Sequence, residues 1–354
     1  MSTRSGRAPK PRHRSMVARL GSLLATVTLV GLLAAVGVVI ELQRAGPAVA
    51  ETTVEVPRGA GVNRIGAILE ERGAIRSALM FRVAERIYGG DRQLQAGEYA
   101  IPAGASVRQV VALMASGRVV QYSLTIPEGW TSAMVADALN TEEHLSGPNV
   151  PVPAEGTILP ETYQFSRGMD RADLLEQMQQ AQADLLERAF AQRGPRSAVA
   201  TPEQAIILAS IVQKETGPGE EARVAAVFTN RLRRNPPMRL ESDPTIIYGL
   251  CQCPRLTDAQ GRPRGIRQSE LDRRTAYNTY QIDGLPPGPI ANPGRAAILA
   301  VLDPPASEEL FFVAKEHENP AAGHVFSATY AEHNAAVPRL RARERAAAQT
   351  PALA

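Results

Sequence analysis

The sequence predicts an α+β protein in which a single N-terminal transmembrane helix precedes two folded regions. An apolar run without a charged residue extends from Leu20 to Ile40. A small pattern of strands and amphipathic helices follows over 51–118, and a larger mixed α/β pattern follows over 119–337. The chain has 354 residues, of which 44% are apolar, and this is sufficient for two or three globular domains.

Residues 1–19 form a basic arm with no acidic residue ahead of the apolar run. At about 1.5 Å per residue, the run over 20–40 reaches about 30 Å, which is enough to cross the hydrocarbon core of a bilayer. It is longer than the core of a typical signal peptide, so a retained anchor is favoured over a cleaved signal. The positive-inside rule keeps the arm in the cytoplasm and places the chain beyond Glu41 outside. The net charge of +3 is too small to indicate nucleic acid as a partner.

The region over 51–118 alternates between strand and helix periodicity. Thr52 to Val56 alternates like a strand, and a helix with Val62, Ile65, Ile68 and Leu69 on one face follows. A second helix is predicted over 78–88, an extended segment over 94–99 and a last helix over 107–114. The pattern predicts a small α/β module.

A helix of the larger region carries the first candidate site residue. Thr201 is a suitable N-cap, Pro202 suits the first helical position and Gln204 completes a capping-box spacing, while 217–219 ends the helix. Glu215 shares one face with the apolar residues Leu208, Ile211 and Val212. Partial burial and the negative end of the helix dipole favour a protonated carboxyl, which is how a glutamate becomes a general acid. The alternative is an ordinary solvated glutamate.

Polar residues follow this helix closely in the sequence. The next helix begins at Glu220 and carries Asn230 and Arg231 in its last turn. A polar segment over 241–245 then leads to Tyr248. A carboxylate followed by so many hydrogen-bonding groups indicates a polar cleft.

The rest of the larger region supplies a second carboxylate and several expected structural elements. Glu161 lies near Tyr163 after a strand predicted over 122–126, and a helix over 173–192 is interpreted as scaffold. The segment over 292–294 is expected to cap a helix, and 310–314 is expected to be a core strand. Residues 338–354 are Ala- and Arg-rich and are expected to form a flexible tail.

Cys251 and Cys253 are expected to lie in a loop. A disulfide across a single intervening residue is strained, and two cysteines without a neighbouring ligand pattern make a poor zinc site. The sequence therefore predicts neither a metal nor a cofactor.

Several long blocks of the sequence resemble the signature blocks of one family. These are EGTILPETYQF, ILASIVQKETG, VAAVFTNRLRRNPPMRLESDPTIIYG, TAYNTYQIDGLPPGPIANPG and HVFSATYAEHN. Together they are similar, in order, to the endolytic murein transglycosylases, the YceG-like family. One position departs from the pattern: members often carry Glu-Lys-Glu where this chain has Gln213-Lys214-Glu215.

The resemblance implies a bacterial inner-membrane enzyme with a periplasmic catalytic domain over 119–337 and a LysM-like subdomain over 51–118 that contacts glycan strands. The implied reaction is lytic cleavage between N-acetylmuramic acid and N-acetylglucosamine, which leaves a 1,6-anhydro end and ends the elongation of nascent strands. Peptidoglycan synthases and division proteins would be partners. Glu215 would be catalytic, and the following would bind substrate: Glu161, Tyr163, Asn230, Arg231, Asp243, Thr245, Tyr248, Tyr277, Asn278, Thr279 and Asn292.

Two alternatives remain open at the level of sequence. A hydrolytic muramidase needs a second carboxylate about 5–9.5 Å from the first, and Glu161 or Asp243 is available. A catalytically silent peptidoglycan-binding scaffold needs none, and the departure at Gln213 favours it. The cleavage position along the strand and the oligomeric state do not follow from the sequence.

Overall fold

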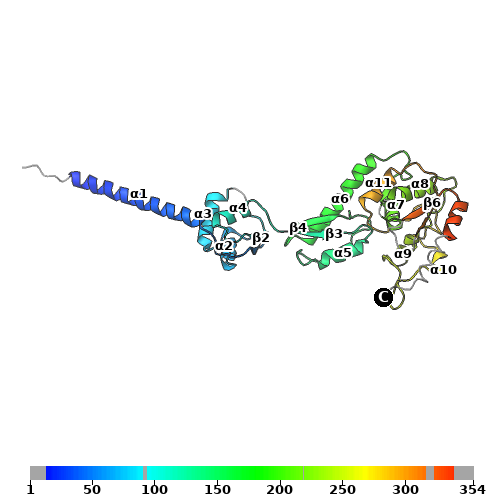
Figure 1. Ribbon diagram of the computed structural model, residues 1–354, viewed down its shortest axis with the longest axis horizontal. Coiled ribbons are helices and arrows are strands. Elements are labelled where there is room, and N and C mark those ends of the chain that lie inside the picture. The colour runs from blue at the N-terminus through cyan, green and yellow to red at the C-terminus, as the bar shows by residue number, and fades with distance from the viewer. Residues whose placement is uncertain (1–12, 91–93, 218, 316–322, 339–354) are drawn as a thin grey trace, which may run out of the picture. The chain divides into compact units, whose positions relative to one another are not determined.

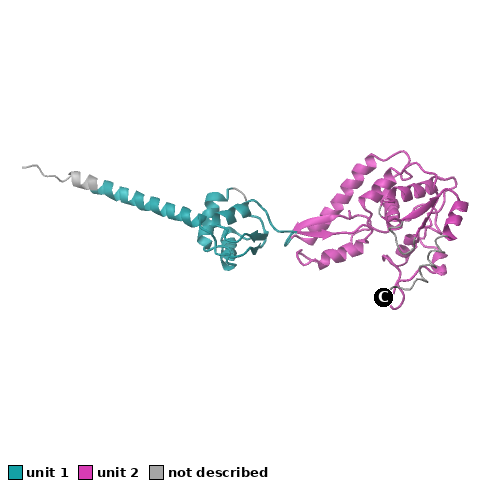
Figure 2. Cartoon of the chain, in the orientation of Figure 1, with its two compact units in different colours: residues 1–121, 166–168 teal, residues 122–165, 169–354 magenta. Residues whose placement is uncertain are grey.

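The computed structural model describes residues 13–90, 94–217, 219–315 and 323–338. Most of the predicted basic arm (1–12) and all but the first residue of the predicted tail (339–354) lie outside the described residues. The chain forms two compact units, one made of residues 1–121 with 166–168 and the other of 122–165 with 169–354 (Figure 2).

A long apolar helix begins the first unit (Figure 1). Helix α1 spans His13–Gln43 and contains one segment, Arg19–Gln43, that is long and apolar enough to cross a membrane. It is longer than the predicted 20–40 because helical geometry continues through the flanking polar residues. The side chains along the apolar part are exposed, but Leu42 in the last turn is fully buried in the core of the module that follows.

The module has the predicted α/β pattern. Its elements are β1 (Thr52–Val56), α2 (Val62–Glu71), α3 (Ala78–Tyr88), β2 (Gly97–Ile101) and α4 (Val107–Ala115). Strands β1 and β2 pair antiparallel from Thr52 opposite Ile101 to Val56 opposite Gly97. The second strand begins in the later part of the predicted extended segment, and its first residue, Gly97, adopts φ 139°, a conformation that glycine tolerates. Together β1, β2 and the inner faces of the helices enclose one apolar core.

The second unit contains a small sheet with two helices. Its elements are β3 (Gln121–Thr125), α5 (Ser132–Thr141), β4 (Thr162–Ser166) and α6 (Arg171–Ala191), and β3 pairs with β4. Phe165, Leu174 and Met178 are buried at the centre of this cluster. The predicted strand and the predicted scaffold helix are both confirmed.

Helix α7 lies at the centre of the remaining elements. These are α7 (Pro202–Glu215), α8 (Glu221–Arg233), α9 (Asp243–Cys251), α10 (Gln268–Leu271), α11 (Arg295–Leu302), β5 (Phe311–Ala314) and β6 (His324–Ser327). Helices α6, α8, α9 and α11 all contact α7. Every residue from Ala205 to Val212 is buried, so the expectation of a single apolar face was wrong. Neighbouring helices cover α7 on all sides.

Other local expectations also need correction. The polar segment after Glu241 is the start of helix α9, and Cys251 is the last residue of that helix rather than part of a loop. Cys251 and Cys253 form a disulfide. Helix α11 has Gly294 as its N-cap without a side-chain cap, because the Asn292 amide is engaged elsewhere. Strand β5 is half-buried rather than a core strand, and it pairs antiparallel with β6.

Candidate active site

Glu215 lies in the last turn of α7, where the helix emerges from the buried core. The chain leaves the helix at Thr216, whose hydroxyl donates to the Val212 carbonyl at 2.9 Å. The partly buried Glu215 carboxyl accepts a hydrogen bond from the Ser242 hydroxyl, with 2.6 Å between Oε1 and Oγ. A helix that is buried from Ala205 to Val212 therefore presents the carboxyl of its last turn to the start of α9.

The surroundings raise the pKa of Glu215 from 4.5 to about 7. Burial of the carboxyl is the largest cause, and the negative charge of Asp243 adds to it. The Ser242 hydroxyl and the positive charge of Arg231 act in the opposite direction. A group with this pKa is present in both protonation states near neutral pH, which suits a residue that must donate and then accept a proton.

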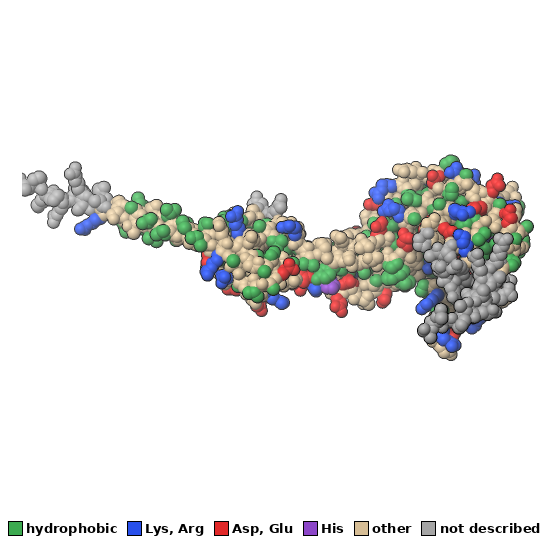
Figure 3. Space-filling model, viewed as in Figure 1, with side chains coloured by type: hydrophobic (Ala, Val, Ile, Leu, Met, Phe, Trp, Pro, Cys, Tyr) green, Lys and Arg blue, Asp and Glu red, His purple; other side chains and the backbone are tan. Residues whose placement is uncertain are grey.

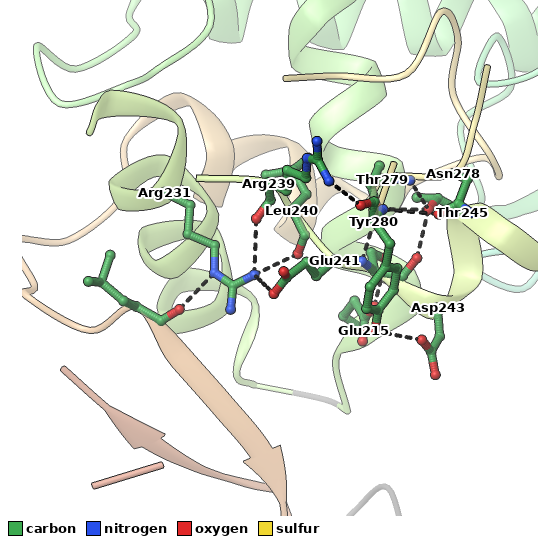
Figure 4. Close-up of polar contacts among 12 residues, drawn as sticks. Glu215, Arg231, Arg239, Leu240, Glu241, Asp243, Thr245, Asn278, Thr279 and Tyr280 are labelled. Carbon is green, nitrogen blue, oxygen red and sulfur yellow. Dashed lines mark hydrogen bonds and ion pairs between the residues drawn. The ribbon is translucent and has the colours of Figure 1, made fainter. Parts of the chain in front are cut away.

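Asp243 is itself held by a tyrosine. The Tyr280 hydroxyl donates to Asp243 Oδ1 at 2.8 Å, and burial with this negative charge raises the pKa of Tyr280, so that it remains a donor (Figure 4). The two carboxyl groups are thus distinguished by their surroundings. Glu215 lies against a helix core, and Asp243 accepts a hydrogen bond from a phenol.

Arg231 supplies positive charge to the site, but its N–H groups donate mainly to backbone carbonyls. Its guanidinium donates to the carbonyls of Leu310, Arg239 and Leu240 at 2.7, 3.1 and 2.9 Å (Figure 4). A longer contact of 3.4 Å joins it to Glu241. Arg231 is therefore a buried structural residue whose charge lowers the pKa of Glu215 without a direct bond to it.

Glu241, which precedes the Ser242 donor, has an unusual backbone conformation. Its φ of 51° lies in the left-handed region, which non-glycine residues rarely adopt. Such strain costs about 1–3 kcal/mol and clusters at functional sites. Here it turns the chain so that the Glu241 carboxylate meets Arg231 while the next residue, Ser242, faces Glu215.

Three of the residues expected to bind substrate form a buried network behind α9. Thr245 and Thr279 bond each other at 2.9 Å, and Thr279 Oγ1 also accepts from the Ser242 backbone N–H. Asn278 donates to the carbonyls of Leu271 and Arg273. All three are fully buried, so their placement is that of supports for Ser242 and its loop.

Three other candidates lie apart from the contacts of Glu215. The Asn230 amide donates to the carbonyls of Ser307 and Glu309, which ties α8 to the segment before β5. Glu161 forms an exposed ion pair with Arg295 at 3.3 Å. The Tyr163 hydroxyl donates to Leu159 at 2.7 Å, and burial raises its pKa to about 12. The structure does not bring these residues together with Glu215.

A second buried carboxylate, Glu155, was not singled out from the sequence. Its Oε1 accepts from the backbone N–H of Ser132 at 2.8 Å and from the Asn292 amide at 3.2 Å, and its Oε2 accepts from the Tyr248 hydroxyl at 3.3 Å. Burial raises the pKa of Glu155, although these donors oppose the shift. The partners come from three distant segments, so no local spacing could have indicated the cluster.

Helix α9 joins the two carboxyl groups. Ser242 and Asp243 begin it beside Glu215, and Tyr248, about 8 Å further along the axis, reaches Glu155. Tyr277 packs against Tyr248 with ring centroids 5.2 Å apart. Gly249 allows this contact, because a Cβ there would lie 2.8 Å from that of Tyr277. The Glu155 and Glu215 clusters therefore share one rigid support.

Gln213, where the chain departs from the family pattern, faces away from Glu215. Its Oε1 accepts from the Gly294 backbone N–H at 2.9 Å, at the start of α11. Lys214 reaches the Gly129 carbonyl at 3.5 Å, and burial lowers its pKa. As predicted, both side chains point elsewhere, and Gln213 joins α7 to α11.

The described part of the chain contains no group of three or more His, Cys, Asp or Glu side chains arranged to hold a metal ion. The arrangement around Glu215 defines a different class of site. A carboxyl of near-neutral pKa, one hydroxyl donor and a second carboxyl group nearby are the components of general acid–base chemistry.

The comparisons place this site within a family. The model of the YceG-like family matches residues 54–339. The chain is 27% identical to an endolytic murein transglycosylase of Bacillus subtilis (strain 168) over 319 residues, which are 80% of this chain and 83% of that protein. It is 26% identical over 337 residues to an endolytic murein transglycosylase of Streptococcus pneumoniae serotype 2, and this match covers 78% of this chain but 58% of that protein.

Among solved structures, a YceG-like protein from Listeria monocytogenes is 28% identical, with a TM-score of 0.46, and the match covers 80% of this chain and 98% of that one. Because the family model matches most of its length, the chain belongs to the YceG-like family.

Proposed function

We propose that this protein is an endolytic peptidoglycan lytic transglycosylase that cleaves the bond between N-acetylmuramic acid and N-acetylglucosamine. The observation that carries the proposal is Glu215, a partly buried carboxyl with its pKa raised to about 7, in a chain of the YceG-like family. The curated relatives from Bacillus subtilis and Streptococcus pneumoniae bear the name of this activity.

The proposed mechanism uses one group twice. Protonated Glu215 gives its proton to the glycosidic oxygen, and the bond to the muramoyl anomeric carbon breaks. The Glu215 carboxylate then takes the proton from the muramoyl C6 hydroxyl as that oxygen attacks the anomeric carbon. A 1,6-anhydro ring closes, no water is consumed, and Glu215 regains its starting state. A nucleophile supplied by the substrate makes a second catalytic carboxylate unnecessary.

Other residues are proposed to support this chemistry. Asp243 stabilises the developing oxocarbenium charge. Further along α9, Tyr248 and the Tyr277 ring packed against it provide aromatic and hydroxyl groups for contact with sugar. Thr245, Asn278, Thr279 and Asn292 act through the backbone that they hold, and Arg231 acts through its charge. Glu161, Tyr163 and Asn230 remain predicted substrate-binding residues without a contact to Glu215.

The proposal extends to the setting of the reaction. Helix α1 anchors the chain in the inner membrane with the catalytic unit in the periplasm, and the module over 51–118 is a LysM-like subdomain that contacts glycan. Cleavage near the membrane would end the elongation of new strands, with peptidoglycan synthases and division proteins as partners.

The deciding experiment compares the full chain with Glu215→Gln on purified peptidoglycan and identifies the products by mass spectrometry. General acid–base assistance is worth about 10²–10⁴-fold, and we expect at least that loss of rate while the fold and glycan binding persist. Products with a 1,6-anhydro end support the proposal. Products with a reducing muramic acid end would make the enzyme a hydrolase, and binding without turnover would make the protein a scaffold.

Gln213→Glu is the matched control. It restores the commoner family residue at a position whose side chain contacts Gly294 and not Glu215. We expect nearly unchanged turnover, because either side chain can accept the Gly294 N–H. A large gain of activity would transfer the catalytic role to position 213.

A further inference from the structure

The outward side of α3 is an exposed stripe of apolar and basic side chains. We define the α3 stripe as Leu79, Arg82, Val83, Arg86 and Ile87, which line one shallow groove of ≈ 390 Å³. Leu79 is 53% exposed and Ile87 is 56% exposed. Their spacing of three and four residues places all five on one side of the helix. Val83, between Leu79 and Ile87, is half-buried against the module core. Two large apolar side chains exposed along one groove, with a third at its base, indicate a binding surface.

The helix cannot turn this stripe inward. Phe81 and Ala84 on the opposite side are fully buried in the core of the module. Ser77 caps the helix by accepting from the Met80 backbone N–H. The stripe therefore stays exposed as long as the module is folded.

The stripe begins beside the end of the apolar helix α1. Arg76, just ahead of α3, donates to the Ala45 carbonyl at 3.2 Å, and Ser77 and Met80 line a small pocket together with Glu41 and Gly46. Figure 1 shows α3 next to the end of α1. Because Leu42 is buried in the module core, no flexible linker separates the module from α1. A bilayer that surrounds the run ending at Ile40 would meet the module within a few residues.

The charge of the α3 stripe is of one sign. It holds two arginines and no acidic residue. Arg82 makes a 3.4 Å contact with Asn63, which leaves most of the five guanidinium donors available. Figure 3 shows hydrophobic side chains along α1 and Lys and Arg side chains on the module next to it. Apolar side chains flanked by arginines are typical of helices that lie in the interface of an anionic membrane.

We propose that the α3 stripe docks on the bilayer surface, with Leu79 and Ile87 among the headgroups, Val83 at the base of the groove and Arg82 and Arg86 on the phosphates of anionic phospholipids. The proposal rests on the membrane anchor of the proposed function. It gives the module a role apart from glycan contact, since a docked module has a fixed height above the membrane.

The test uses the full chain in nanodiscs of phosphatidylglycerol and phosphatidylcholine. A single new cysteine carries an environment-sensitive fluorophore at Leu79→Cys or Ile87→Cys, and lipids with a spin label near the headgroup quench it. Val30→Cys, at the middle of the apolar run, reports on α1 through lipids that carry the spin label at the end of the acyl chain. Glu55→Cys on the exposed face of β1 reports on the rest of the module. Unaltered protein shows whether the Cys251–Cys253 disulfide takes up label.

We expect quenching at Leu79→Cys and Ile87→Cys and none at Glu55→Cys. Arg82→Gln with Arg86→Gln should weaken docking about 25-fold, since each arginine near an anionic surface is worth about fivefold. Arg64→Gln with Arg72→Gln removes the same charge elsewhere on the module and should leave the quenching unchanged.

The outcomes separate the two proposals. If the label at Val30→Cys is quenched and the labels on α3 are not, the docking proposal is overturned and the anchor proposal stands. An unquenched Val30→Cys overturns the anchor itself. A third outcome is that the fluorophores on α3 report burial only at high protein density in the membrane and are not quenched by lipid. This result would assign the stripe to a second copy of the chain and would also overturn the docking.

Discussion

The near-neutral pKa of Glu215 results from opposed local effects. Burial and the charge of Asp243 raise it, while the Ser242 hydroxyl and the charge of Arg231 lower it. Burial alone would favour a permanently protonated carboxyl, and the hydroxyl alone would favour a permanently ionised one. A group that alternates between acid and base needs effects that raise its pKa and effects that lower it. The start of α9 supplies one of each, the charge of Asp243 and the hydroxyl of Ser242.

Substitutions beside Glu215 should therefore shift its titration in opposite directions. Ser242→Ala removes a donor to the ionised form and should move the alkaline limb of the kcat/KM profile to higher pH. Asp243→Asn removes a negative charge and should move that limb to lower pH. Rates between pH 5 and 9 measure both shifts. Asp283→Asn, which alters an exposed partner of Arg239, is the control. Shifts of the same sign would contradict this electrostatic account.

The raised pKa also predicts a pH-dependent cost in stability. The folded state holds its proton up to a pKa of about 7, against 4.5 for an ordinary glutamate. The free energy of unfolding contributed by Glu215 therefore falls as pH rises from about 4.5 to 7, by up to roughly 3 kcal/mol. Glu215→Gln should unfold at higher urea concentration than the unaltered protein at pH 8, and nearly together with it at pH 4.5. An equal difference at both pH values would refute the assignment.

Residue identity predicted some of this site and not the rest. Glu215 could be predicted because a carboxylate in the last turn of an apolar helix is a local pattern. Whether a polar residue faces solvent or a buried partner is not local. Thr245, Asn278 and Thr279 have the composition of a binding surface, yet the two threonines bond to each other and Asn278 bonds to backbone carbonyls. Glu155 was missed because residues from three separate segments create its surroundings.

At the scale of elements, most helix positions followed from periodicity and caps, and the exceptions have physical causes. Helix α3 begins and ends where predicted, since it has a serine N-cap and one buried face. Helix α7 has the predicted length, but its burial on every side depends on neighbours that the local pattern does not contain. The start of α9 was predicted as a polar segment and not as a helix, because Asp243 and Pro244 occupy its first turn.

Glu155 should act as a link that positions α9. Glu155→Ala leaves the Ser132 N–H without its acceptor, removes one of the acceptors of the Asn292 amide and releases Tyr248, at an expected cost of about 1–3 kcal/mol in the free energy of unfolding. Urea unfolding measures the cost, and kcat/KM should fall with it. Glu155→Gln should recover most of the stability because an oxygen acceptor remains.

Glu161→Ala is the matched control from the same segment. Its exposed pair with Arg295 is worth at most about 1 kcal/mol, so the free energy of unfolding should change little. If Glu155→Ala were as mild as Glu161→Ala, α9 would not depend on this link.

At the scale of the whole molecule, the apolar helix and the module after it act as one body within the first unit. The sequence indicates an apolar helix over 20–40 and a separate module that begins with a strand at Thr52, and periodicity cannot show that the two are joined. In the structure Leu42 packs into the module core, and the Gly46 N–H donates to the Gly104 carbonyl. The end of α1 is therefore part of the module fold, and any membrane topology assigned to α1 fixes the side on which the module lies.

The last prediction concerns that topology. The basic residues ahead of Leu20 should remain in the cytoplasm, and everything beyond Glu41 should be outside, because positive charge flanking an apolar span is retained on the cytoplasmic side. Alkaline phosphatase fused after Ala50 should be active in cells, and the same enzyme fused after Arg19, ahead of the span, should be inactive. Replacement of the arginines and lysine over 4–19 by glutamine should lower the activity of the Ala50 fusion. A reporter after Ala50 that works only in the cytoplasm would place the Glu215 site on the wrong side of the membrane for peptidoglycan.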